Sequence, residues 1–299
     1  MPNYKKPVFI VGMPRSGTTL MQAILCNTGK YFPMPETHFF ARAAYKLPEN
    51  GLSRKNRKRI RRKLIKKSRF EIDREFPDHL TTRKAVFEYL VDQFNTGGAD
   101  TFLEKTPRHV FFYSKILEYY PDARFICMIR EPKNVVSSQL ANSPKINKSI
   151  IRLSLLYNKI ATAILNIDRL QKVMLVKYED LTGSTEPMLK NICGHLNIPY
   201  DARFVEKVAA PPEIVSHHEF WKSRNIHQHR VIRNNPDKWR ETLNDAQADT
   251  INFITGSKAA KFGYASTYSC FGITNGFIRD IGRLLSKNEL KKIMSIIHG

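Results

Sequence analysis

A glycine-rich loop near the N-terminus has residue types that suit an anion. Residues 12–19 read Gly-Met-Pro-Arg-Ser-Gly-Thr-Thr, and they follow the short apolar run Val8–Val11. Glycines let the backbone approach an anion closely, and a helix that begins after such a loop presents free N–H groups to it. The candidate binding residues in this loop are Pro14, Arg15, Ser16, Gly17, Thr18 and Thr19. The pattern therefore favours a phosphate-binding loop over an ordinary tight turn.

The loop departs from that of the nucleoside triphosphatases. Those proteins use the spacing G-x-x-x-x-G-K-[ST], whereas Thr18 stands here at the lysine position and Arg15 lies inside the loop. No clear strand-end aspartate for magnesium is evident either. We expect the loop to bind a phosphate without holding a γ-phosphate and Mg²⁺. A nucleotide kinase or a related phosphotransferase of similar architecture is the alternative.

Arg130 and Ser138 form a second candidate site for an anion. Arg130 follows the apolar run Arg124–Ile129, and Ser138 comes eight residues later, past Glu131-Pro132-Lys133. Because proline can open a helix at its first turn, Ser138 would face back towards the end of the strand. An arginine and a serine that converge there suit another phosphate. Taken alone, an arginine at a strand end is more often a salt-bridge partner.

Short apolar runs alternate with helical patterns along much of the chain. We expect strands at 8–11, 101–103, 124–129 and 173–176, and helices at 20–26, 85–94, 110–120, 134–140 and 150–170. Residues 30–50 look mainly like irregular loop. This alternation predicts an α/β fold with a parallel β-sheet that is flanked by helices. Functional groups should then gather beyond the carboxyl ends of the strands.

At this point the residues resemble the sulfotransferases that use 3′-phosphoadenosine 5′-phosphosulfate (PAPS). Val11–Leu20 is similar to the family's 5′-phosphosulfate loop, and Arg130 and Ser138 match its 3′-phosphate signature. Lys177–Leu181, which reads Lys-Tyr-Glu-Asp-Leu, is similar to its [RK]-Y-E-D-L element. The resemblance spans residues 6–182, with a weaker match near Trp239, and is closest to the bacterial, Golgi and tyrosylprotein branches.

The resemblance implies a P-loop-like nucleotide-hydrolase architecture and an enzyme that binds PAPS without a metal. Such an enzyme moves the sulfuryl group to a hydroxyl or an amine by in-line displacement. The acceptor class stays open among carbohydrate, lipid, peptidyl tyrosine and small molecules. Tyr178 is expected to pack on the adenine, although a plain core tyrosine is the other interpretation. Lys238, beside Trp239, is expected to close over the phosphates.

Sulfuryl transfer requires a general base for the acceptor hydroxyl and a cation for the charge that grows on the leaving phosphate. The resemblance implies a glutamate base, which would be Glu36, and His38 is the second candidate because imidazole titrates near neutral pH. Arg15 and Lys105 are the candidate cations. Each assignment has a purely structural alternative. Glu36 could be an acid on a surface loop or form a structural ion pair with Arg15, and Lys105 could be a solvated loop lysine.

The net charge of +22, from 49 Lys+Arg and 27 Asp+Glu, favours anionic ligands. Residues 54–69 hold eleven of these basic residues and no acid. This run makes an anionic-surface-binding protein a further alternative, and it leaves membrane contact and recruitment of an acidic substrate open. A solvated cationic helix explains it equally well. We expect no nucleic-acid partner, because no recognised binding motif is present.

The expected domain organisation is one α/β domain over 1–270 and a C-terminal helical tail over 271–299. The domain would carry a basic helical insertion at about 50–70 and a loop-rich lid at about 211–242. In this lid Arg240 joins Lys238 as a candidate to close over the phosphates, and Arg230 and Arg233 compete for that role. An apolar stripe in the tail, from Phe277 to Leu285, suits core or dimer packing, so a homodimer stays open.

The four scattered cysteines suggest neither a zinc site nor a disulfide framework. The polar N-terminus predicts a cytoplasmic protein.

Overall fold

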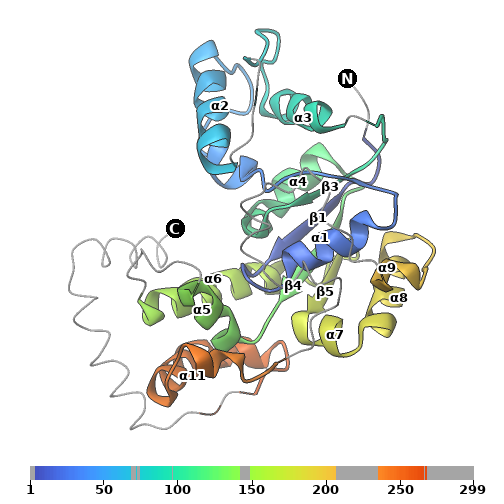
Figure 1. Ribbon diagram of the computed structural model, residues 1–299. Helices are drawn as coiled ribbons and strands as arrows, with labels where there is room; N and C mark the ends of the chain where they lie inside the picture. Colours follow the sequence, from blue (N-terminus) through green and yellow to red (C-terminus); the bar gives the residue numbers. More distant parts are fainter. Residues whose placement is uncertain are drawn as a thin grey trace.

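A five-stranded parallel sheet forms the centre of the protein. The computed structural model describes residues 4–68, 72, 75–95, 97–141, 149–206, 235–265 and 267. The strands are β1 (Val8–Gly12), β2 (Phe32–Pro33), β3 (Phe102–Lys105), β4 (Arg124–Ile129) and β5 (Val173–Lys177). They pair in the order β2-β3-β1-β4-β5 (Figure 1). The predicted α/β fold with a parallel sheet is therefore confirmed.

Both faces of the sheet are covered by helices, because successive residues of each strand point to opposite faces. Val8 and Ile10 of β1 belong to one apolar cluster, which includes residues of α1 (Thr18–Cys26), α7 (Tyr178–Gly183) and α8 (Thr185–Leu196). Phe9 and Val11 belong to the opposite cluster. That second cluster includes residues of α3 (Arg83–Phe94), α4 (Tyr113–Tyr119) and α6 (Ile150–Ile167). A strand buried on both faces reads as a continuous apolar run, as the sequence of β1 does.

The remaining described helices pack on the helices and turns around this sheet. They are α2 (Arg54–Ser68), α5 (Pro132–Ala141), α9 (Arg203–Glu206) and α11 (Asp245–Ala260), with short turns η1 (Phe39–Ala43), η2 (Pro107–Phe112) and η4 (Lys238–Glu241). Side chains cap several helices at the N-terminus. Ser149 accepts the Arg152 N–H of α6 at 3.2 Å, and Asn244 forms a capping box with Gln247 at the start of α11.

Several segments differ from the sequence expectations. Residues 30–50 are mainly loop, as expected, but they also contain two short elements, β2 and the π-helical turn η1. A two-residue edge strand that includes Pro33 carries too little pattern to be predicted, and proline is tolerated there because an edge strand leaves one side unpaired. The expected helix at 110–120 is divided at Tyr113 into η2 and α4. Helix α5 begins at Pro132, two residues before the predicted start, as a proline at the first helical position allows.

Helix α6 is long and apolar enough to cross a bilayer by length and composition, with half of its window buried. Its buried side chains Leu153, Tyr157, Ile160 and Ile164 pack in the interior, and α11 packs against the helix. It is therefore a core helix of this fold.

The basic run forms a helix that is anchored by a few apolar side chains. Ile60 and Leu64 of α2 are fully buried, whereas Ile65 is exposed. Of the predicted lid at 211–242, only residues 235–242 lie in the described part, and the tail at 271–299 lies outside it. Trp239 of η4 is buried in a small cluster with Val136 and Ile251, which attaches the end of the lid segment to α5 and α11.

Candidate active site

The glycine-rich loop lies at the carboxyl end of β1 and leads into α1. Gly12 has φ +117°, and a Cβ there would lie 2.2 Å from the Met128 carbonyl oxygen, so only glycine fits against β4. Ser16 is fully buried, and its hydroxyl donates to the Met13 carbonyl at 2.5 Å. The Ser16 side chain therefore holds the loop in shape, and its backbone remains the group that could face a ligand.

The N-terminus of α1 is well suited to an anion. No acidic side chain lies in its first turn, and Gly17 at the N-cap supplies no side-chain acceptor. The first backbone hydrogen bond of the helix runs from Met21 N to Gly17 O at 2.9 Å. The preceding N–H groups, including those of Thr18 and Thr19, have no acceptor within the helix. They are positioned to donate to a phosphate.

Arg15, Arg130 and Ser138 come together next to this loop, as the sequence predicts. Arg15 Nε donates to Ser138 Oγ at 3.1 Å, across the gap between β1 and α5. Arg130 Nη1 donates to the Arg15 carbonyl at 3.1 Å. Burial and the neighbouring Arg130 lower the pKa of Arg15, whereas Glu36 raises it. Two arginines held this close create a positive site that an anion would stabilise.

Tyr178, the first residue of α7, is a buried member of the apolar cluster on one face of the sheet, and its ring packs under Arg130. The Arg130 guanidinium carbon lies 4.2 Å from the centroid of the Tyr178 ring. The same ring closes against the loop, because a Cβ on Gly17 would lie 2.6 Å from Tyr178 Cδ2. Arg130 Nε is buried and has no hydrogen-bond partner in the described structure. Tyr178 thus orients Arg130 beside the loop and leaves one guanidinium nitrogen for a ligand.

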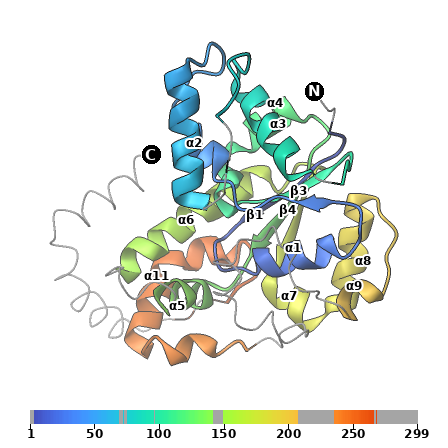
Figure 2. The ribbon, with the colours of Figure 1, turned by 45° about the horizontal axis from the view of Figure 1, so that its top comes forward.

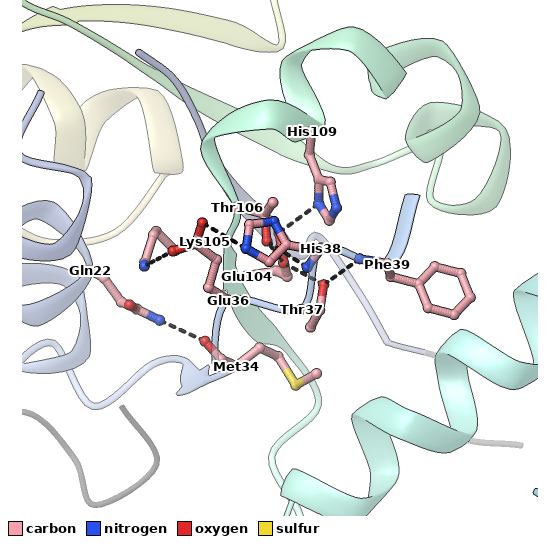
Figure 3. A network of polar contacts seen from close by, with 10 residues as sticks. All are labelled: Gln22, Met34, Glu36, Thr37, His38, Phe39, Glu104, Lys105, Thr106 and His109. Atoms are coloured by element: carbon pink, nitrogen blue, oxygen red, sulfur yellow. Dashed lines mark hydrogen bonds and ion pairs between the residues drawn. The ribbon is translucent and has the colours of Figure 1, made fainter. Parts of the chain in front are cut away.

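A second group of polar residues lies at the carboxyl end of β3 (Figure 3). Lys105, whose side chain is 2% exposed, lies with Nζ 2.9 Å from Glu36 Oε2. His38 Nε2 lies 3.3 Å from Glu36 Oε1. Glu36 is one-fifth exposed, so the carboxylate keeps access to solvent while a buried cation holds it. The three predicted catalytic residues Glu36, His38 and Lys105 therefore lie together.

The buried carboxylate of Glu104 holds this group in place. Its oxygens accept from Thr37 Oγ1 at 2.8 Å and from Thr106 Oγ1 at 2.6 Å, and His109 Nδ1 lies 3.0 Å away. Burial raises the pKa of Glu104, but His109 and the two hydroxyls outweigh it, so the pKa is lowered overall. Since Thr37 lies between Glu36 and His38, Glu104 fixes the segment that carries both base candidates.

Further hydrogen bonds fix the same segment from two sides. Gln22 of α1 donates to the Met34 carbonyl at 2.7 Å, and His38 N donates to Thr106 Oγ1 at 3.3 Å. His38 adopts φ +50°, a left-handed conformation that is uncommon for a residue with a side chain. Burial lowers the pKa of His38 to about 4, against the effect of Glu36. A neutral His38 can donate from Nε2 to Glu36, which leaves Nδ1 as an acceptor.

Glu36 connects the two groups of residues. It acts electrostatically on Arg15 from the loop and also binds Lys105 from β3. Parallel strands end at one edge of the sheet, and β1 lies between β3 and β4 there. This order places the anion-binding loop next to the carboxylate and lysine that could handle an acceptor hydroxyl.

The described residues of the predicted lid have no contact with the phosphate-binding residues among the described contacts. Lys238 is exposed on η4, and none of its described contacts joins it to the phosphate-binding residues. Its neighbour Trp239 is packed between Lys133 Nζ at 4.8 Å and the Arg240 guanidinium at 4.3 Å. Arg230 and Arg233 lie outside the described residues. The role of Lys238 stays a prediction.

Sequence reasoning missed the network around Glu104. The members of the network are Thr37, Glu104, Thr106 and His109. One signal was available, because Glu104 and Thr106 flank Lys105 at a strand end.

Within the described residues, no group of three or more His, Cys, Asp or Glu side chains could hold a metal ion.

Comparison with known proteins agrees with this arrangement. The family model described as "Sulfotransferase family" matches residues 7–202, which contain every site residue discussed above except those of the lid. The chain is 20% identical to the sulfotransferase domain of the Synechococcus PCC 7002 olefin synthase, with a TM-score of 0.57, over 88% of this chain and 97% of that one. The sulfotransferase domain from the curacin biosynthetic pathway gives 16% identity and a TM-score of 0.52, over 88% and 99%.

A curated relative, an uncharacterized protein of Aquifex aeolicus (strain VF5), is 22% identical over 250 residues. The match covers 79% of this chain but spans only 30% of that relative's length. The structural matches share the α/β fold, and the family match covers well over half of the sequence. The chain belongs to the sulfotransferase family.

Proposed function

We propose that this protein transfers the sulfuryl group of PAPS to a hydroxyl group of an acceptor, with Glu36 as the general base. The observation that carries the proposal is the junction of two sites at one sheet edge. The anion-binding loop, with Arg15, Arg130 and Ser138, lies beside the Glu36–Lys105 pair. The loop has no lysine at the position of Thr18, which argues against a nucleoside triphosphatase.

The residues present suit a donor with two phosphate positions. The loop from Pro14 to Thr19 and the N-terminus of α1 would hold the 5′-phosphosulfate end. Arg130 and Ser138 would hold the 3′-phosphate, and the unpartnered Nε of Arg130 is a donor without an acceptor in the described structure. Tyr178 is available to contact the adenine. When bound, PAPS supplies an activated sulfuryl group and a phosphate leaving group.

The chain's own residues supply the proton acceptor and the positive charge. Glu36 accepts the proton of the acceptor hydroxyl at one of its carboxylate oxygens. Lys105 Nζ and Arg15 provide positive charge where negative charge grows, and their burial strengthens that interaction. Neutral His38 orients the Glu36 carboxylate through Nε2, so the two base candidates act as a pair with different roles.

Nucleotide binding gives the first test. We expect adenosine 3′,5′-bisphosphate to raise the melting temperature without Mg²⁺, and Arg130→Ala to lower the affinity by about tenfold, the cost of one charge-assisted hydrogen bond. A matched control is Arg203→Ala, because Arg203 is exposed and pairs with Asp201 on the surface. A response to Mg·ATP alone would favour the phosphotransferase alternative and reject this proposal.

Transfer gives the second test. We expect PAPS and an extract of acceptors to yield products that are heavier by one sulfuryl group, detected by mass spectrometry. Glu36→Gln should keep nucleotide affinity and lose transfer. If His38→Ala loses transfer and Glu36→Gln keeps it, the base is His38.

A further inference from the structure

One peptide group beside the phosphate-binding loop is held on both of its polar atoms by side chains. It joins Arg130 to Glu131, the two residues between β4 and α5. Its carbonyl oxygen accepts from Tyr157 Oη of α6 at 3.2 Å, and its N–H donates to Glu179 Oε1 of α7 at 3.1 Å. Because a peptide group is planar, these two bonds fix the direction in which the Arg130 side chain leaves the backbone.

The contact of Glu179 continues the pairing of β4 with β5 beyond the end of the sheet. The parallel register of the two strands ends at Ile129, which lies opposite Lys177. The next residues are Arg130 and Tyr178, where the chains leave the sheet for α5 and α7. One residue later, the side chain of Glu179 accepts the N–H that a strand backbone would otherwise accept. Glu179 therefore sets the spacing of the segments that carry Arg130 and Tyr178.

The second carboxylate oxygen of Glu179 is also held. Tyr264, which follows α11, donates to Glu179 Oε2 at 2.7 Å, and its partly buried ring packs against the apolar core. In both ribbon views α5, α7 and α11 lie at the end of the molecule away from α3 and α4 (Figures 1 and 2). Among the described contacts, both oxygens of Glu179 thus bind neutral donors, and the carboxylate does not occupy the Arg130 guanidinium.

The guanidinium of Arg130 depends on this support for its direction. It lies 4.2 Å from the centroid of the Tyr178 ring, and its Nη1 donates to the Arg15 carbonyl at 3.1 Å. Its Nε is buried and has no hydrogen-bond partner in the described structure. An arginine pairs with two oxygens of one phosphate only when its planar fork faces them. A rotation of the peptide group after Arg130 would turn that fork away.

We propose that Glu179 is a positioning residue, which with Tyr157 orients Arg130 and thereby determines the preference for a nucleotide that carries a 3′-phosphate. The inference rests on the proposed function, which assigns Arg130 to that phosphate. The sign of the effect separates positioning from simple charge. Glu179 is negative, so its removal would strengthen phosphate binding through charge alone, whereas the loss of positioning weakens it.

Calorimetry with two nucleotides measures this preference. Adenosine 3′,5′-bisphosphate and adenosine 5′-phosphate differ only in the 3′-phosphate, so the ratio of their affinities isolates that group. We expect E179A to lower the ratio by about threefold to tenfold, up to the cost of one charge-assisted hydrogen bond, which R130A loses entirely. E179Q should keep the ratio, because its amide oxygen still accepts the Glu131 N–H. Y157F removes only the hydroxyl that binds the Arg130 carbonyl and should lower the ratio as well.

Two further variants test the route of the effect. D180A is the matched control, because Asp180 is the next residue of α7, has the same charge and is exposed; it should not lower the ratio. R130A/E179A should have the same ratio as R130A alone, since Glu179 acts through Arg130. The affinity for adenosine 5′-phosphate should stay unchanged in every variant, which also reports that each one is folded.

Four results would overturn the inference: a ratio that E179A or Y157F leaves unchanged, an equal loss in E179Q or D180A, a further loss when E179A is added to R130A, or an equal fall in the affinity for both nucleotides. The last result would mean that Glu179 supports the fold in general. A wild type without a preference for the 3′-phosphate, or a preference that survives R130A, would reject the proposed function and this inference together. R130A and E179A therefore distinguish the two failures.

Discussion

Replacing Glu104 with glutamine removes a buried charge while keeping the shape of the side chain. The carboxylate takes hydrogen bonds from Thr37, Thr106 and His109. The glutamine oxygen can still accept from the two hydroxyls, but its NH₂ group would meet His109 Nδ1–H. A change of tautomer at His109 would move the proton to Nε2, which is buried and has no partner in the described structure. Either way one buried donor is left without an acceptor.

The size of the effect follows from that count. A buried donor without an acceptor costs about 1–3 kcal/mol, and for a chain of this size each kcal/mol shifts the melting temperature by roughly 2–4 °C. We therefore expect Glu104→Gln to melt about 2–12 °C below the wild type. Transfer should fall further than stability suggests, because Thr37 would no longer hold the segment of Glu36 and His38.

Thermal unfolding across a pH series measures this prediction. The pKa of Glu104 is lowered in the folded protein, so its stabilisation is present at neutral pH and is lost as the pH falls through the folded pKa. The difference between the wild type and Glu104→Gln should therefore shrink in acid. Glu118→Gln is the control, since its carboxylate is exposed and pairs with Lys115 on the surface. A variant that melts with the wild type, or a difference that does not shrink in acid, would refute the reasoning.

Three further predictions concern the loop and the base. Gly17→Ala should weaken binding of adenosine 3′,5′-bisphosphate in calorimetry, because its Cβ would lie 2.6 Å from Tyr178 Cδ2; unchanged affinity would show that the loop adapts. Lys105→Ala should lower the transfer rate by about 10²–10³-fold, the usual cost of losing one group that stabilises transition-state charge, with Lys190→Ala, at an exposed lysine that pairs with Glu186, as the control. The pKa of His38 falls to about 4 on folding, so between about pH 6.5 and pH 4 its proton binds mainly to the unfolded chain and lowers the free energy of unfolding as the pH falls. His38→Gln should therefore reduce the slope of the free energy of unfolding against pH in this range. An unchanged slope would contradict that cause.

The central strands and the phosphate-binding loop could be predicted from the sequence because their signals are local. The run Arg124–Ile129 is a strand with the predicted bounds, since the five buried residues between Arg124 and Arg130 leave few alternatives. The pairing of Arg15 with Ser138 was also predictable in outline. Both follow strands that end at the same edge of a parallel sheet, so two local patterns imply one place in space.

The parts that could not be predicted depend on contacts between distant segments. In the sequence, nothing distinguishes Glu104 from an ordinary residue that precedes Lys105. It accepts a hydrogen bond from Thr37 only because β2 pairs with β3 and places residues 34–38 next to the end of β3. Two residues carry that pairing, which is too short a stretch for a pattern. Arg42 of η1 and Arg108 of η2 are likewise ordinary loop arginines in the sequence. Only the packing of η1 on η2 brings their segments together.

The arrangement around Glu36 explains how one carboxylate can lie close to both the donor site and the acceptor hydroxyl. A base that meets an acceptor hydroxyl must be near the donor's positive site, yet a carboxylate drawn fully into that site would lose access to the acceptor. Here the buried Lys105 holds one oxygen at 2.9 Å, and neutral His38 contacts the other at 3.3 Å. Arg15 and Arg108 of η2 also attract the carboxylate, without an ion pair to it among the described contacts. Because both arginines act on the same carboxylate, the two substitutions should not be additive in transfer.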